Sequence, residues 1–197
     1  MKCKSRIAYI LLLTGLLAVP VKGQYEFGIS ALSLSFTSTE YGLPFMLMTP
    51  INPGIEAELS LFTNEKQKSR QDFSLALGYY YHEMIANGTY LYGNYNYKRR
   101  VADLFGIDLF AGLGYLNSIY PGDSYLYNSE NGGFDQHASV RHYAAFHLGF
   151  GISYIGFSKM APFIHYDMAA FNIWEGLYLR TTAMFKVGVK IKLVNQN

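Results

Sequence analysis

The chain has 197 residues, of which 50% are hydrophobic, 17% are aromatic and only 15% are charged. This length suits a single domain, and such low charge argues against a disordered tail or a heavily solvated soluble protein. The formal charge of +2, with no basic cluster beyond residues 98–100, is too small for a nucleic-acid-binding protein. One cysteine excludes a disulfide framework and a multi-cysteine metal site, and we expect no cofactor.

The N-terminal segment has the pattern of a secretory signal peptide. Basic residues precede an apolar run over residues 7–19, and Gly23 suits a cleavage site before Gln24. The run is short against the roughly 20 residues that a helix needs to cross a bilayer, which disfavours a membrane anchor. We therefore predict a cleaved signal peptide over residues 1–23. Its removal would leave residues 24–197, with no cysteine and with 12 basic and 14 acidic residues.

The rest of the chain alternates between apolar and polar residues with a period of two, which is the pattern of β-strands. Phe146 and Leu148 fall on one face of such a segment, for example, whereas His147 and Ser153 fall on the other. Strands are predicted over residues 25–37, 53–63, 71–84, 88–99, 103–118, 140–156, 160–170 and 178–193.

Three features favour a membrane barrel over a soluble periplasmic β-protein, which would also alternate. First, several segments are long enough for a tilted membrane strand, which needs about 9–11 residues. Second, one face of each strand is polar and glycine-rich, while the other is apolar and aromatic. Closure also satisfies every strand edge in hydrocarbon. The third feature is the length of the connections, which alternates as in transmembrane barrels. The outer set is 38–52, 85–87, 119–139 and 171–177, three of which are long, and the short periplasmic set is 64–70, 100–102 and 157–159.

The sequence therefore predicts an all-β protein: an eight-stranded antiparallel transmembrane β-barrel over residues 24–197, located in the outer membrane and preceded by the cleaved signal peptide. An even number of strands returns both ends of the barrel to the periplasm. The last aromatic residue is Phe185, whereas many such barrels end on an aromatic residue. We expect the barrel-insertion machinery to be a partner that uses a different signal here.

Several short segments resemble a family of uncharacterised small outer-membrane β-barrel proteins of Gram-negative bacteria. The resemblance covers most of residues 45–193 and implies the barrel fold, but it brings no established activity and no catalytic residue. Its segments are Pro53-Gly54-Ile55, Leu77-Gly78-Tyr79-Tyr80-Tyr81-His82, Leu91-Tyr92, Tyr95-Asn96-Tyr97-Lys98, Leu113-Gly114-Tyr115-Leu116-Asn117-Ser118-Ile119 and Gly188-Val189-Lys190.

The alternation also assigns polar side chains to the lumen. Eight strands leave a lumen that side chains can just fill, and buried charges must pair. We therefore expect a plug of salt bridges between four carboxylates and the cations Arg141, Arg180, Lys186 and Lys190, with no open pore. The predicted lumen network is Glu56, Glu58, His82, Asp108, Arg141, His147, His165, Asp167, Arg180, Lys186 and Lys190, with Asn94, Asn96 and Lys98 beside it.

Candidates for catalysis are few. Ser153 and His147 share a strand face, but six residues separate them by about 20 Å, so they cannot touch. His137 and Ser139 form a His-x-Ser pair of the kind that lipid A deacylases use, although Val140 replaces the usual Asn and no downstream acid is evident. Two histidines, His137 and His142, do not make a metal site.

Two classes of function follow. The first is a structural or interaction barrel without catalysis, whose outer loops contact lipopolysaccharide, a partner or an extracellular ligand of unknown identity. The alternative is a lipid A acyl hydrolase that uses His137 and Ser139, and small-pore transport is a third option. Tyrosines along the strands are candidates for interfacial belts on their lipid-facing half.

Overall fold

The computed structural model describes residues 25–37, 52–82, 86–120, 124–128, 132–137, 140–172 and 179–193. The predicted signal peptide and most of the predicted loop 38–52 lie outside these residues. Within them no helix is long and apolar enough to span a bilayer. The strands are β1 (Tyr25–Thr37), β2 (Pro53–Glu65), β3 (Ser69–Tyr80), β4 (Asn87–Ala102), β5 (Phe105–Ile119), β6 (Ser124–Asn128), β7 (Gly133–His137), β8 (Val140–Tyr154), β9 (Met160–Asn172) and β10 (Leu179–Leu193).

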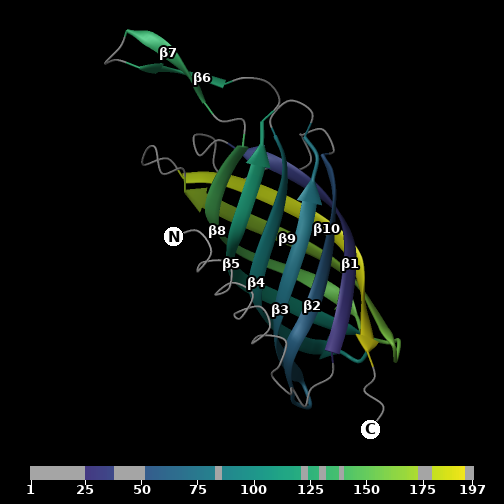
Figure 1. Ribbon diagram of the computed structural model, residues 1–197. Helices are drawn as coiled ribbons and strands as arrows, with labels where there is room; N and C mark the ends of the chain where they lie inside the picture. Colours follow the sequence, from purple (N-terminus) through teal and green to yellow (C-terminus); the bar gives the residue numbers. More distant parts are fainter. Residues whose placement is uncertain are drawn as a thin grey trace.

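Eight of these strands form a closed barrel in the order β1-β10-β9-β8-β5-β4-β3-β2 (Figure 1). All neighbours are antiparallel, and β1 closes the barrel by pairing with β10 from Tyr25 opposite Leu193 to Thr37 opposite Thr181. On its other side β1 pairs with β2. Closure leaves the barrel sheet without an open edge, as a membrane-spanning sheet requires. The predicted eight-stranded antiparallel barrel is therefore confirmed.

The structure differs from the prediction at two outer connections. The segment 119–139, expected to be a plain loop, contains the two-stranded sheet β6–β7, which stands beyond the end of the barrel in Figure 1. Gly132, directly before β7, has a φ of 61°, a conformation that favours glycine. Strand β3 ends at Tyr80 rather than at residue 84, and the His82 N–H donates to the Asn87 side chain at 3.1 Å instead of to a backbone carbonyl of a neighbouring strand.

The two faces of the wall have reversed polarity compared with a soluble protein. Leu113, Leu77 and Ile152 point outward with 69%, 59% and 58% of their surfaces exposed, whereas His147 and Asp167 are fully buried in the lumen. An apolar surface that continues around a barrel is not compatible with water as the outer solvent. It matches the lipid-facing band of a transmembrane barrel, whose polar residues face inward.

A β-bulge in β2 changes this alternation near one end of the barrel. The register with β3 shifts between Ser60 and Phe62, so that Thr63 lies opposite the inward-facing Asp72. Thr63 then accepts a hydrogen bond of 3.3 Å from Arg70. A simple period of two across the whole strand would have directed Asn64 inward instead.

Candidate functional site

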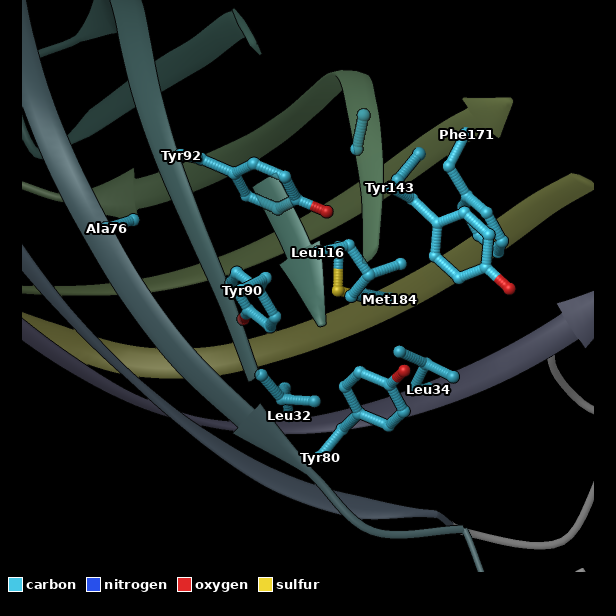
Figure 2. Packing of buried hydrophobic residues seen from close by; sticks show 12 residues of the cluster. Leu32, Leu34, Ala76, Tyr80, Tyr90, Tyr92, Leu116, Tyr143, Phe171 and Met184 are labelled. Carbon is cyan, nitrogen blue, oxygen red and sulfur yellow. The ribbon is translucent and has the colours of Figure 1, made fainter. Parts of the chain in front are cut away.

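The lumen is filled in layers, and the layer toward the end with the long connections is aromatic. Figure 2 shows Tyr90 and Tyr92 of β4 projecting inward toward Met184 of β10. The Tyr90 and Tyr92 rings stack with centroids 4.8 Å apart, and the Tyr80 hydroxyl lies 2.8 Å from the Ser118 hydroxyl. The layer is therefore a packed cluster in which the buried Tyr80 hydroxyl has a polar partner. Its members are Leu32, Leu34, Ala76, Tyr80, Tyr90, Tyr92, Leu116, Tyr143, Ala145, Ala169, Phe171 and Met184.

Glycines on neighbouring strands make room for these tyrosines. Gly78 lies opposite Tyr90, and Gly114 lies opposite Tyr92. A Cβ atom added at Gly78 would overlap the Tyr90 ring, and one added at Gly114 would overlap Tyr92. Each tyrosine ring thus lies over the backbone of a glycine on the next strand. The space left by the glycine lets the ring lie in the lumen.

Lys186 lies at the centre of the middle layer. Its Nζ is 2.6 Å from Glu56 Oε2 and 2.6 Å from Asp167 Oδ2. The Tyr90 hydroxyl donates to the same Glu56 oxygen at 2.7 Å. All four side chains are buried, so each carboxylate depends on Lys186 for the compensation that a buried charge requires.

His147 packs directly against this ion cluster. Its Nε2 is 2.6 Å from Asn94 Oδ1, and its Nδ1 is 3.8 Å from Asp167 Oδ2. The imidazole stacks on Tyr92 with centroids 4.3 Å apart. A side chain at Gly112 would come within 2.5 Å of His147 Nε2, so the ring occupies space that only glycine leaves open.

A second ionic layer lies toward the end with the short turns. Lys190 Nζ is 2.9 Å from Glu58 Oε2, and Ser74 donates to Glu58 at 2.6 Å. Asn96 donates to Asp72 at 2.6 Å. The partners of Glu58 come from β3, β4 and β10, and those of Asp72 come from β2, β3 and β4. Neither carboxylate therefore relies on a single partner.

Asp108 forms the other half of this layer. His165 Nε2 lies 3.0 Å from Asp108 Oδ2, the Ser153 hydroxyl donates to Oδ1 at 3.3 Å, and Lys98 Nζ is 3.6 Å from Oδ1. A serine hydrolase triad needs the histidine between the serine and the carboxylate. Here the carboxylate lies between Ser153 and His165, which is the wrong order for activating the serine.

Three predicted lumen residues lie elsewhere or have other contacts. Arg141 places its guanidinium 4.9 Å from the centroid of the Tyr120 ring, and no described carboxylate forms an ion pair with it. Among the described residues Arg141 therefore has a cation–π contact in the place of the expected salt bridge. His82 lies beyond the end of β3 and outside the lumen layers. Arg180 is opposite Phe171 in the β9–β10 ladder, and its side chain is outside the described part of the structure.

An ion cluster that was not predicted from the sequence lies at the same end as the short turns. Arg70 forms an ion pair with Glu26, and its Nε is 3.5 Å from Asp72 Oδ2. The signal was available, because Glu26 is in phase with the inward Gly28 and Asp72 is in phase with Ser74. Among the tyrosines, Tyr79 and Tyr95 are exposed on the outer wall as expected, whereas Tyr80, Tyr90 and Tyr92 are interior.

The candidate deacylase pair is only partly described. The backbone of His137 ends β7 and lies opposite Ser124. The side chain of His137 and all of Ser139 are outside the described residues, so this pair stays a prediction. Within the described residues, no group of three or more histidine, cysteine, aspartate or glutamate side chains is arranged to hold a metal ion.

Comparison with known proteins supports the fold. No protein-family model and no curated protein matches the chain. Neisserial surface protein A is similar in structure, with a TM-score of 0.57 and 10% identity over 86% of this chain and 97% of that chain. Ail of Yersinia pestis has a TM-score of 0.55 and 10% identity over 88% of this chain and 100% of that chain. The N-terminal barrel domain of Pseudomonas aeruginosa OprF has a TM-score of 0.50 and 15% identity over 86% of this chain and 100% of that chain.

All three similar structures are small outer-membrane barrels, and at such low identity the likeness concerns the fold. The closed sheet and the apolar outer wall provide the independent physical reason for the same placement. The protein is therefore a small eight-stranded β-barrel of the outer membrane.

Proposed function

We propose that the protein is a structural or ligand-binding barrel that acts through its outer end and its lipid-facing wall, without catalysis and without conducting solutes through the lumen. The observation that carries this proposal is the filled interior. Lys186, with its two carboxylates, occupies the middle of the barrel, and the aromatic layer covers it toward the outer end.

The packing of the aromatic layer supports this proposal in quantitative terms. The space among Leu34, Tyr80, Tyr90, Tyr92, Leu116, Thr182 and Met184 measures about 10 Å³. A cavity needs at least roughly 10–15 Å³ to hold one water molecule. A continuous file of water through this layer is therefore incompatible with the packing, and ions would have no hydrated path.

The outer end is the place where a ligand or partner would bind. The hairpin β6–β7 projects from it, and its two strands pair only with each other among the described residues. Such short strands present free backbone groups on both edges, which favours contact with another molecule. We infer that lipid, including lipopolysaccharide, contacts the wall and the outer rim, and that the insertion machinery assembles the barrel.

Conductance in planar lipid bilayers tests the closed lumen. We expect the wild-type protein to insert without producing current steps, because the aromatic and ionic layers leave no water path. Replacing Tyr90 and Tyr92 together with alanine should admit water to the outer layer and raise the ion leak. Tyr95→Ala is the matched control, since Tyr95 is on the same strand but on the outer wall. Regular current steps from the wild type would refute the proposal.

A further inference from the structure

A basic pocket opens at the end of the barrel that carries the short turns. Its volume is about 80 Å³, and it lies among the β2–β3 turn, the end of β4, the β8–β9 turn and the end of β10. In barrels of this class the short turns face the periplasm. Its charged lining consists of Lys66, Lys68, Arg70, Lys98, Arg100 and Lys192, against Glu26 and Glu65.

Most of these cations lack a carboxylate partner in the described structure. Glu26 is already paired with Arg70, and Lys98 is 3.6 Å from Asp108 deeper in the lumen. No described carboxylate forms an ion pair with Lys66, Lys68, Arg100 or Lys192. Six cations against two carboxylates leave this concave surface with an excess of positive charge, which concentrates the field and attracts anions.

The backbone that carries the exposed cations of the pocket is held by hydrogen bonds. The Lys66 N–H donates to the Ser69 carbonyl at 2.8 Å, and the Arg100 N–H donates to the Lys68 carbonyl at 2.9 Å. These bonds fix the turn that carries two of the lysines against the end of β4. Alternation then directs Arg100 and Lys192 toward the barrel axis, in phase with Lys98 and Lys190.

Arg70 forms a buried part of the lining. It is only 7% exposed, and the β2 bulge supplies Thr63 as an acceptor for one of its nitrogens. Its buried Nε lies 3.5 Å from Asp72 but donates no hydrogen bond. Arg70 is therefore held in place by Glu26, Asp72 and Thr63 and forms a fixed floor to the pocket. The donors available to a ligand are those of the more exposed cations above it.

We propose that this pocket binds a single phosphate group presented from the periplasmic side. A tetrahedral oxyanion offers several oxygen acceptors to converging Lys and Arg donors, and about 80 Å³ suits one such group with a little water. The same chemistry could belong to free phosphate or to the head group of an anionic phospholipid in the inner leaflet. Ile155, Phe157 and Ala161 complete the lining and would contact the non-phosphate part of the ligand. This inference does not depend on the proposed function.

A titration followed by NMR tests the proposal and separates the two sources. The full chain is placed in maltoside micelles, which contain no phosphate, and inorganic phosphate replaces chloride at constant ionic strength. A parallel sample in phosphatidylcholine nanodiscs is compared with one that contains phosphatidylglycerol. We expect saturable shifts of the amides of residues 66–70 and 98–100. Shifts with inorganic phosphate identify free phosphate as sufficient, and shifts confined to phosphatidylglycerol identify the lipid head group.

Two variants with matched charge changes test the location of the site. Arg100→Gln should weaken binding by at least about tenfold, because it removes a charge-assisted donor. Arg99→Gln removes the same charge from the adjacent residue, which does not line the pocket, and should leave the dissociation constant within about twofold. Dispersed spectra establish that each variant is folded. No saturable shift in either medium, or equal weakening by Arg99→Gln, would overturn the proposal.

Discussion

Replacing Lys186 with methionine is expected to lower the free energy of unfolding of the barrel by about 3–5 kcal/mol. The Lys186 ammonium lies 2.6 Å from a carboxylate oxygen of Glu56 and 2.6 Å from one of Asp167, and all three groups are buried. Methionine fills a similar volume but leaves both carboxylates without a cation. Urea unfolding in lipid vesicles, followed by circular dichroism, measures the loss.

Two companion variants show whether the pairing itself is responsible. Lys192→Met removes a cation from the same strand and the same lumen phase, but no described carboxylate pairs with Lys192, so we expect a loss below about 0.5 kcal/mol. Adding Glu56→Gln and Asp167→Asn to Lys186→Met should recover most of the stability, since no buried charge is then unpaired. Equal losses from Lys186→Met and Lys192→Met would mean that the central cluster is not an important source of stability.

Introducing a charge on the outer wall should have an effect of similar size. Leu148 is in the middle of β8, points outward and is 42% exposed. Leu148→Arg would place a guanidinium at mid-depth in hydrocarbon, at an expected cost of about 2–4 kcal/mol of unfolding free energy. The same urea titration in vesicles measures this cost.

The depth dependence provides the control for this substitution. Val140 is at the outer end of the same strand and on the same face. An arginine there can reach the interface, so we expect Val140→Arg to cost only about 0–1 kcal/mol. If both substitutions cost the same small amount, the middle of the wall would not be in contact with lipid.

The barrel itself was predictable from the sequence because the environment of each strand is simple. One face meets lipid and the other meets the lumen, so a period of two persists along β8 and β10 and identifies them strongly. The hairpin β6–β7 was not found, because both of its strands have only five residues and lie inside a connection. The Gly132-Gly133 pair between two aromatic segments was the available signal of a turn.

The inner face was predicted better as a set of residues than as a set of contacts. Alternation assigns Glu56, Asp167 and Lys186 to the lumen, and the structure places them there. Their mutual contact depends on the register and tilt of three strands, which composition and periodicity do not give. Arg141 illustrates the difficulty: it contacts the Tyr120 ring, although pairing by charge alone would assign it a carboxylate.

The interior tyrosines were ambiguous for a different reason. Tyrosine is common both in interfacial belts and in packed interiors, so its presence does not indicate a face. On β4, only the position in the two-residue alternation distinguishes the inward-facing Tyr90 from the outward-facing Tyr95. The glycine opposite each inward tyrosine was a second signal, because Gly78 and Gly114 leave the space that the rings of Tyr90 and Tyr92 occupy.

The central claim is that apolar side chains face lipid while polar side chains fill the lumen, and a nitroxide scan along β8 tests it most directly. The full chain with Cys3→Ser contains no cysteine, so single cysteines can be introduced and labelled. In lipid vesicles, oxygen accessibility should be high at residues 144, 146, 148 and 150 and low at 143, 145 and 147. A flat or inverted profile, with the labels at 146 and 148 shielded from lipid, would contradict the account.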